Sequence, residues 1–379
     1  MNTQLVTQTR LIASSRNWID AEALRQFCHA GQLDSVCLAV GLPDLHSGRN
    51  HPTGAAFVTD GVLYPQLVGK DVGCGVGLWK TDLHPHDVNL DNWAERRFDL
   101  ELPWEGDGAA CLASEGLPYT TFDHLFGTLG AGNHFAELQA VEKVHDPAEF
   151  TGLGLKRGQL VLLVHSGSRG LGESVLSDFV QEHGAAGVPG YSPAAEPYLE
   201  GHDLAVRWAK ASRALLAQRF LDTLGASGER ILDVCHNSLT SRELDGDPVW
   251  LHRKGAAPAD EGPIVIPGSR GSLSYLVMPC GDGVEHAWSL AHGAGRKWPR
   301  HEGRLRVRER FHPDELTETV LGSRVICANR DLLYEEAPMA YKDIEVVIVD
   351  LVDAGLISVI ATLRPLLTYK TRLPKWLPA

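Results

Sequence analysis

The segment Gln159-Leu160-Val161-Leu162-Leu163-Val164 runs directly into His165-Ser166-Gly167-Ser168-Arg169-Gly170, and this junction decides the predicted fold. The uninterrupted apolar run predicts a buried strand. The glycine-rich stretch after it predicts a tight turn, and the residues up to about His183 predict a helix. A buried strand that leads through a short loop into a helix is typical of mixed α/β folds.

A second helix and a second strand follow along the chain. Residues His202 to Leu224 predict the clearest helix, because one face is apolar and Gly225 stops it. That apolar face comprises Leu204, Trp208, Ala211, Leu215 and Leu216. Arg230 to Cys235 then predict a strand that ends at His236.

The N-terminal part predicts a helix, two strands and two glycine-rich loops. We expect Asp20 to cap a helix that runs through Phe27 and ends at Gly31. The strands are expected at 36–40 and 55–59, with a loop over 41–54 between them and a tight glycine loop over 70–77. Residues 84–125 are acidic and irregular, and they give no assignable pattern.

Short strands that alternate with turns are expected from Pro248 to Cys280. Residues 345–351 and 356–363 predict a hairpin over Asp353-Ala354-Gly355. No repeat, low-complexity tract or long linker divides the sequence. We therefore expect a single mixed α/β (α+β) domain over residues 1–379.

Composition limits the classes of function. The 379 residues are 44% hydrophobic and 22% charged, as in ordinary globular proteins. The formal net charge of −13 argues against unspecific nucleic-acid binding, although a local basic patch can bind a polyanion. Seven scattered cysteines without a CxxC motif predict a reducing compartment, the cytoplasm. Residues 1–18 lack a signal-peptide pattern, and Asp350 and Asp353 interrupt the most apolar segment, so we expect no membrane span.

Four apolar or glycine-rich segments each end in side chains that bind transition metals. They are Asp71-Val72-Gly73-Cys74-Gly75, Gly132-Asn133-His134-Phe135-Ala136-Glu137, Val164-His165-Ser166-Gly167-Ser168-Arg169 and Val234-Cys235-His236-Asn237. One aspartate, one cysteine and three histidines suit one or two divalent ions: imidazole and thiolate favour Zn, Co, Ni or Fe, and carboxylate admits Mn. Each histidine alone also has a plainer interpretation, an ordinary residue at the end of a strand. The spacing is that of neither a zinc finger nor an HExxH helix.

A second group of residues suits phosphate binding, because arginine binds phosphate with two hydrogen bonds and neighbouring glycines admit backbone N–H groups. Its members are Arg169, Arg253-Lys254-Gly255, Ser269-Arg270-Gly271-Ser272 and Arg296. A basic run from Arg296 to Arg310 is either a track for a nucleic-acid backbone or a solvated surface.

The stretch Ala291-His292-Gly293-Ala294-Gly295-Arg296 places a histidine among small residues. Each glycine costs roughly 0.5–1 kcal/mol against alanine in a regular element, a cost that is explained if a ligand must reach His292. The plainer interpretation is a glycine-rich turn. Together with the metal-ligand group and the phosphate-binding group, the stretch around His292 indicates a metal-dependent reaction on a phosphate or nucleotide. His292 is then a further ligand or a nucleophile that forms a phosphoramidate.

These motifs, in this order, resemble the RtcB family of GTP- and Mn-dependent RNA ligases over roughly residues 40–370. The motifs are Asp71-Val72-Gly73-Cys74-Gly75, Gly130-Ala131-Gly132-Asn133-His134-Phe135, His165-Ser166-Gly167-Ser168-Arg169-Gly170, His236-Asn237, His252-Arg253-Lys254-Gly255-Ala256, Pro267-Gly268-Ser269-Arg270-Gly271 and His292-Gly293-Ala294-Gly295-Arg296. The resemblance implies a mixed α/β fold with a central metal and nucleotide pocket.

The resemblance also implies an activity and its residues. RNA 3′-phosphate or 2′,3′-cyclic phosphate ends would be joined to 5′-hydroxyl ends through GMP on His292. Cys74 matches a thiolate that bridges two Mn²⁺ ions, with Asp71 and His134 on one ion and His165 and His236 on the other. The implied GTP contacts are Asn133, Glu137, His236, Asn237, Ser269, Ser274, His292, Gly293, Ala294, Gly295 and Lys370, and the phosphate or RNA contacts are Arg169, Arg253, Lys254 and Arg296.

Three features depart from the family. Residues 371–379 extend past Lys370, Arg270 stands where methionine is common, and the segment between Cys74 and His134 is short. They suggest a branch that repairs one damaged RNA. The resemblance itself implies an archease-like activator as a further partner. The alternatives are a metal-dependent RNA-end hydrolase or cyclic phosphodiesterase without ligation, and a catalytically silent RNA-binding subunit. The intact Cys74 and His292 argue against the silent subunit.

Overall fold

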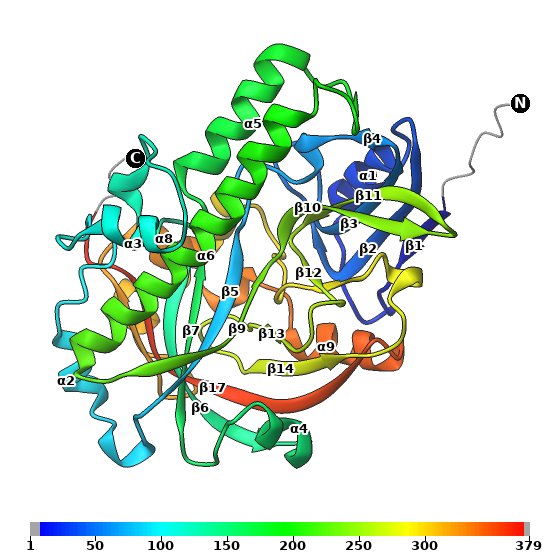
Figure 1. The fold of residues 1–379 in the computed structure, drawn as a ribbon. Coiled ribbons are helices and arrows are strands. Elements are labelled where there is room, and N and C mark those ends of the chain that lie inside the picture. Colours follow the sequence, from blue (N-terminus) through cyan, green and yellow to red (C-terminus); the bar gives the residue numbers. More distant parts are fainter. Residues whose placement is uncertain (1–7, 375–379) are drawn as a thin grey trace, which may run out of the picture.

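The computed structural model describes residues 8–374, which form two larger β-sheets with helices on their outer faces (Figure 1). This mixed α/β architecture confirms the predicted fold class. Residues 375–379 of the predicted C-terminal extension lie outside the described residues. No helix within residues 8–374 is long and apolar enough to cross a membrane.

The larger sheet contains the strands that carry most of the chemistry-bearing residues. Its strand order is β13-β14-β17-β6-β7-β5-β9, and β16 pairs with β17 beside this path. In chain order the strands are β5 (Gly75–Thr81), β6 (Phe135–Val144), β7 (Leu160–Ser166), β9 (Gly228–Cys235), β13 (Ile264–Ile266), β14 (Ser274–Pro279), β16 (Arg324–Cys327) and β17 (Ile357–Thr371).

A second sheet of five strands has the order β1-β2-β3-β11-β10. Its strands are β1 (Gln8–Leu11), β2 (Val36–His46), β3 (Thr53–Asp60), β10 (Asn237–Leu244) and β11 (Asp247–Lys254). Two short ladders pair β12 (Ala256–Pro258) with β15 (Ser289–Ala291) and β4 (Val62–Leu63) with β8 (Val188–Pro189). His236 alone separates β9 from β10, so one residue joins the two larger sheets.

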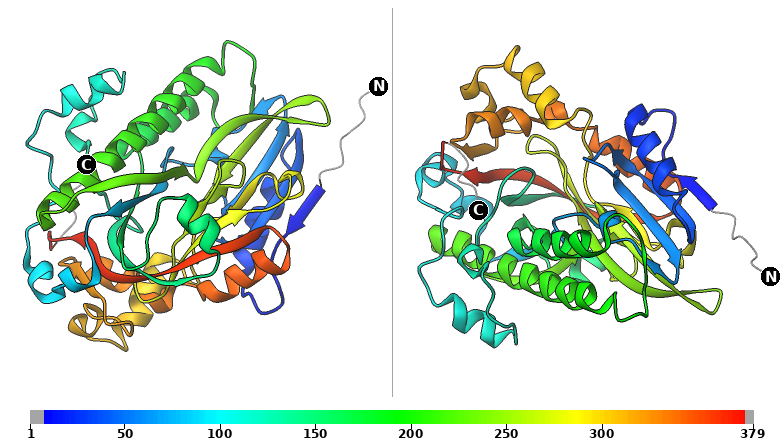
Figure 2. Two further views of the ribbon diagram at one scale, coloured as in Figure 1. Left: turned by 60° about the horizontal axis from the view of Figure 1, so that its bottom comes forward. Right: turned by 90° about the horizontal axis from the view of Figure 1, so that it is seen from above.

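The helices cover the sheets from outside, and Figure 2 shows α5 and α6 side by side along one flank. Their bounds are α1 (Ala21–Ala30), α2 (Leu90–Glu95), α3 (Gly108–Ser114), α4 (Pro147–Gly152), α5 (Gly170–His183), α6 (Glu196–Leu224), α7 (Arg300–Arg308), α8 (Arg330–Glu335) and α9 (Ile344–Asp353). Helix α6 packs on β5, β7 and β9. Leu216 and Phe220 on this helix are fully buried in one cluster with residues of β6 and β7, which fixes α6 against the sheet.

Several predicted elements are confirmed with small changes of extent. Asp20 caps α1, with Ala23 N donating to its Oδ1 over 2.8 Å. Helix α6 begins before the predicted start, at Glu196, because Pro197 is tolerated in a first turn. Strand β2 continues through the predicted loop to His46. Gly75, expected in a tight loop, is the first residue of β5.

The predicted hairpin at residues 345–363 is wrong in its first half. Residues 344–353 form helix α9, whose N-terminus is capped by Asp343. Valine and isoleucine favour strands, but packing decides here: Ile344, Val347, Ile348 and Leu351 recur at helical spacing and are buried together. The second half is the start of β17.

Candidate active site and metal centre

A cavity of about 250 Å³ lies where the two larger sheets meet. Strand register explains why its residues gather there. Gly75 of β5 pairs with Ser166 of β7 on one side and with Cys235 of β9 on the other. Cys74, His165 and His236 therefore reach the same end of the sheet from distant parts of the sequence.

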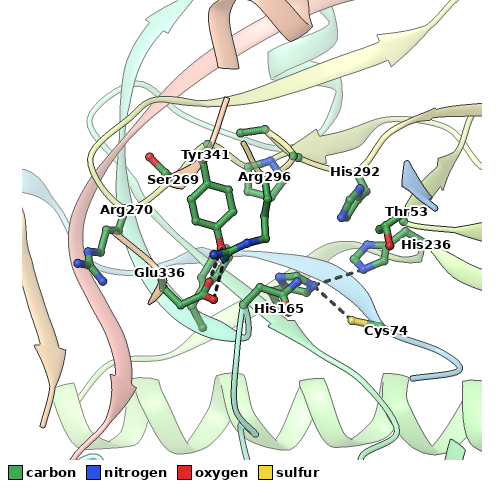
Figure 3. A pocket seen from close by; sticks show the side chains of 18 of the residues that line it. Thr53, Cys74, His165, His236, Ser269, Arg270, His292, Arg296, Glu336 and Tyr341 are labelled. Carbon is green, nitrogen blue, oxygen red and sulfur yellow. Dashed lines mark hydrogen bonds and ion pairs between the residues drawn. The ribbon is translucent and has the colours of Figure 1, made fainter. Parts of the chain in front are cut away.

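The predicted metal ligands form one compact cluster, and Figure 3 shows Cys74, His165 and His236 of this cluster. The Sγ atom of Cys74 lies 3.3 Å from His165 Nε2 and 3.4 Å from His134 Nε2. His165 Nε2 lies 3.3 Å from His236 Nε2, and His134 Nε2 lies 2.9 Å from Asp71 Oδ2. Two candidate ligand groups result: Asp71, Cys74 and His134, and Cys74, His165 and His236. Cys74 belongs to both.

The chemistry of these donors fits two divalent cations. Burial, with neighbouring imidazoles, holds the pKa of His165 and of His236 well below the usual range, so both rings are neutral and their nitrogens can bind metal. Burial likewise raises the pKa of the Cys74 thiol, and Asp71 adds to this effect. A bound cation would lower the pKa of this thiol again, because it stabilises the thiolate form. The Oδ1 atom of Asp71 is buried without a hydrogen-bond partner, as expected of an unused ligand atom.

Two further contacts hold the cluster in place. His134 Nδ1 lies 3.1 Å from the Leu129 carbonyl, which turns its Nε2 toward the cluster. Gly73 has φ of +76°, and a Cβ there would lie 3.0 Å from both Ala209 Cβ and Val206 Cα of α6. A glycine is therefore required for the Cys74 loop to sit directly on this helix.

His292 follows strand β15 and is fixed by Asp44 of β2. Its backbone N–H donates to Asp44 Oδ2 over 3.0 Å, and its Nδ1 donates to the same oxygen over 2.6 Å. Because Nδ1 is occupied, the lone pair of His292 is on Nε2. The ring centroid lies 4.7 Å from that of His236 and 6.3 Å from that of His46, which stacks on it. Gly295, with φ of +72°, permits the close approach to Asp44, since a Cβ there would lie 2.3 Å from the Asp44 carbonyl oxygen.

A buried acid and a buried amine lie at another part of the cavity. Glu137 accepts hydrogen bonds from Thr368 Oγ1 and Gln139 Nε2, and burial raises its pKa to about 7. Lys370 donates to the Gly132 carbonyl over 2.8 Å, and burial lowers its pKa to about 8. The cavity thus offers an acceptor and a donor away from His292.

Glu336 is the centre of a third group. Arg296 donates to Glu336 Oε1 over 3.1 Å, Arg300 lies 3.5 Å from the same oxygen, and the Tyr341 hydroxyl donates to Oε2. Burial alone would raise the pKa of Glu336, but Arg300, Lys370 and Arg296 outweigh it and bring the pKa to about 2. Glu336 is therefore ionised and orients the two arginines along the cavity wall (Figure 3).

Most of the predicted site residues meet in this cavity. Its lining includes Asp71, Cys74, Asn133, Glu137, His165, His236, Asn237, Ser269, His292, Gly293, Ala294, Gly295, Arg296 and Lys370. His134 joins them through Cys74 and Asp71. Arg169 lies behind this cluster, where its Nε donates to Thr128 Oγ1 over 3.4 Å.

Three predicted residues point elsewhere. Arg253 is fully buried, paired with Asp260 at 2.9 Å and donating to the Trp288 carbonyl over 2.7 Å. This ion pair belongs to the packing of β11 and keeps Arg253 out of the cavity lining, so its phosphate contact stays a prediction. Lys254 donates to the His51 carbonyl over 2.9 Å, outside the cavity lining. Ser274 accepts a hydrogen bond from Gln139 Nε2 over 3.0 Å. Because Gln139 also donates to Glu137, Ser274 helps to hold the side chain that fixes Glu137.

Sequence reasoning missed several residues of the site. The cavity lining also includes His46, Thr53, Phe135, Arg270, Arg300, Glu336, Tyr341 and Thr368, and Asp44 lies directly behind His292. Arg270 and Arg300 had appeared only as members of larger basic groups. Pro43-Asp44-Leu45-His46 carried a usable signal, a carboxylate and an imidazole in a loop-like segment. Glu336 carried none.

The basic run at residues 296–310 is largely paired with carboxylates. Arg304 lies 3.0 Å from Asp331, and Arg306 lies 2.6 Å from Glu302. Arg296 and Arg300 line the cavity, although the side chain of Arg300 is 45% exposed. The run is therefore divided between the cavity wall and an ion-paired surface on α7.

Comparison with known proteins agrees with this geometry. The family described as tRNA-splicing ligase RtcB matches residues 26–102 and 118–371. The chain belongs to the RtcB family. It is 43% identical over 363 residues to RNA-splicing ligase RtcB2 of Escherichia coli, covering 95% of this chain and 94% of that protein.

More distant RtcB proteins cover a similar share of the chain. RNA-splicing ligase RtcB of Mycobacterium tuberculosis is 30% identical, covering 87% of this chain and 96% of its own length. tRNA-splicing ligase RtcB of Thermococcus kodakarensis is 29% identical, covering 86% of each. The internal segment that the RtcB family match leaves out, residues 103–117, includes helix α3.

Proposed function

We propose that this RtcB-family RNA ligase joins RNA 3′-phosphate or 2′,3′-cyclic phosphate ends to 5′-hydroxyl ends through GMP carried on His292. One observation carries the proposal: His292, held at Nδ1 by Asp44, shares a cavity with a cluster of metal ligands. A nucleophile with a free Nε2 beside such a cluster suits attack on a phosphate.

The nucleophilic step uses His292 Nε2. This nitrogen bonds to the α-phosphorus of GTP, the bond to the β-phosphate oxygen breaks, and pyrophosphate leaves. A 2′,3′-cyclic phosphate end is first opened by water to a 3′-phosphate, with cleavage of the bond from phosphorus to the 2′-oxygen. An oxygen of the RNA 3′-phosphate then takes the GMP from His292 as the N–P bond breaks, and the 5′-hydroxyl oxygen attacks the 3′-phosphorus and releases GMP as the RNA strands join. Asp44 keeps the imidazole oriented and stabilises the positive charge that it gains during attack.

We assign two Mn²⁺ ions to the cluster, one held by Asp71, Cys74 and His134 and the other by Cys74, His165 and His236. When bound, these ions would neutralise the triphosphate and stabilise the leaving pyrophosphate. Arg296 and Arg300, oriented by Glu336, supply further positive charge on the cavity wall.

Glu137 and Lys370 suit the guanine base. A guanine presents N–H donors on N1 and N2 and an acceptor at O6, which match a carboxylate and an ammonium group. Adenine has the opposite pattern at its N6 and N1 edge, so this pair would favour GTP over ATP. The carboxylate of Glu137 is also fixed by Thr368 and Gln139.

The test is labelling of the protein with GTP that carries radioactive α-phosphate, in the presence of Mn²⁺. We expect acid-labile label on the wild-type protein and none on His292→Ala, because no other group in the site replaces the imidazole. Label on His292→Ala at the wild-type level would contradict the nucleophile assignment. A hydrolase or cyclic phosphodiesterase would process RNA ends without retaining label on protein.

The partners follow from the same chemistry. RNA with the two complementary ends is the substrate, in RNA repair or tRNA processing. We also propose an archease-like activator, whose addition would raise the labelling of a slow wild-type enzyme. The seven free cysteines support a cytoplasmic location.

A further inference from the structure

Arg213 lies in the middle of α6, and its guanidinium is fully buried beside the metal-ligand cluster. Its NH1 group donates to the Gly73 carbonyl and to the Ser166 carbonyl, each over 2.8 Å. Its NH2 group contacts Cys235 Sγ at 3.4 Å. One side chain thus bonds to three separate strand ends.

Each of these three contacts lies next to a proposed metal ligand. Gly73 precedes Cys74, Ser166 follows His165, and Cys235 precedes His236. We propose that Arg213 is a positioning residue of the metal centre, which sets the relative placement of the three segments that carry Cys74, His165 and His236. The inference rests on the metal centre of the proposed function.

The charge of Arg213 is balanced locally. Asp233 Oδ1 accepts from Arg213 Nε over 2.8 Å and lies 2.7 Å from NH2. The side chain of Asp233 is also buried, so the two form an interior pair without net charge. An unpaired guanidinium here would repel cations bound at the cluster. The pair therefore supplies hydrogen bonds without that repulsion.

Arginine suits this position better than lysine. A planar guanidinium offers five N–H donors in fixed directions, so it can bond several acceptors at once. An ammonium group has its three donors on one nitrogen, which cannot reach Asp233, Gly73 and Ser166 together. The substitution Arg213→Lys would therefore keep the charge and lose part of the positioning.

The backbone of α6 adds to this arrangement. Gly73 sits against Val206 and Ala209, which lie about two turns and one turn before Arg213. Helix α6 spans 29 residues and packs on the strands that carry the ligands. One long helix therefore holds all three segments that carry Cys74, His165 and His236, in addition to the contacts that the segments make with one another.

The experiment compares Arg213→Lys with Arg253→Lys, a matched control. Arg253 is also fully buried and paired with an aspartate, but its contacts are on Trp288, Ser289 and Asp260, away from the cluster. Metal-free protein is titrated with Mn²⁺ by calorimetry, and with Co²⁺ to follow its thiolate absorption band. Thermal unfolding of the metal-free proteins is measured in parallel.

We expect Arg213→Lys to bind Mn²⁺ roughly 10- to 100-fold more weakly, the usual effect of losing a residue that orients ligands, and to show an altered Co²⁺–thiolate band. Arg253→Lys should lose thermal stability but keep wild-type affinity. Wild-type affinity in Arg213→Lys overturns the inference, whatever its unfolding temperature. If the wild-type protein itself binds neither metal, the metal centre fails and the inference with it.

If Arg213→Lys does not fold, Asp233→Asn is the second variant whose Mn²⁺ affinity is measured. It leaves an acceptor oxygen for the guanidinium and removes the balancing charge. We then expect weaker Mn²⁺ binding, with the deficit growing at low ionic strength. Unchanged binding in folded Asp233→Asn would contradict the charge balance that the inference assigns to Asp233.

Discussion

Asp44 shows how a single buried carboxylate can set the chemistry of a neighbour. One of its oxygens accepts from both the backbone N–H and the Nδ1 of His292. This arrangement specifies which ring nitrogen is free, and it does so before any substrate is present. An amide at this position can accept the same bonds, but it provides no charge to balance a cationic imidazole.

Asp44→Asn should therefore slow formation of the GMP-bound protein by roughly 10²- to 10⁴-fold, the usual range for a group that supports proton or charge development. Mn²⁺ affinity should stay near the wild-type value, because Asp44 is not among the ligand groups. Single-turnover labelling and calorimetry measure the two quantities. Asp350→Asn, another buried aspartate that accepts from Asn17 outside the cavity, is the matched control. A labelling rate equal to that of this control would refute the role given to Asp44.

The proposed metal ligands were predictable from sequence because each has a local signature. Cys74 lies between two glycines and His165 follows an apolar run, and strand pairing then brings them together. Glu336 could not be assigned in this way, because nothing in its own neighbourhood indicates its partners. Asp44 lies in a segment with a usable signal, but its role depends on His292, which is 248 residues away in the sequence.

Among the secondary-structure elements, α9 is the one for which the strand preference of single residues gave a wrong prediction. Its valines and isoleucines favour a strand when taken one by one. Burial of every third or fourth side chain against the larger sheet makes a helix the better solution, and Asp343 supplies its cap. The C-terminal strand β17 was predicted in part, but its full length to Thr371 was not.

Two identical substitutions in α9 test this assignment. Val347 is fully buried, whereas Val352 is exposed. Val347→Ala should lower the free energy of unfolding by about 1–3 kcal/mol, since it removes buried methyl groups and leaves a cavity. Val352→Ala should be neutral or slightly stabilising, because alanine is the better helix former. Denaturant unfolding gives both values; equal losses at the two positions would contradict the helix.

At the scale of the whole molecule, charge is distributed unevenly. The chain has a formal net charge of −13, yet Arg270, Arg296, Arg300 and Lys370 all line the cavity. An acidic exterior repels polyanions in general, while these residues attract a phosphate that enters the cavity. The basic surface of α7 adjoins the cavity at Arg300, which lines it.

Replacing Arg304, Arg306 and Arg308 together by alanine should flatten the salt dependence of RNA binding, because fewer counterions are released when fewer phosphates are contacted. The slope of log affinity against log salt should fall by up to about 2, at roughly 0.7 for each lost contact to single-stranded RNA. Arg10, Arg16 and Arg25, which lie near the N-terminus and each pair with an acid, provide a control with the same change in net charge. Equal slopes in the two triple variants would mean that the arginines of α7 form a solvated surface and do not contact RNA.

Strand β17 comes late in the chain but lies in the middle of the larger sheet, between β14 and β6. Until it inserts, that sheet is in two pieces and Lys370 is absent from the cavity. A nascent chain on the ribosome can therefore expose the proposed ligands Asp71 and Cys74 before the cavity is complete. Synthesis that stops before residue 370 yields products whose cavity lacks Lys370, so we expect them not to bind the proposed GTP as the full chain does.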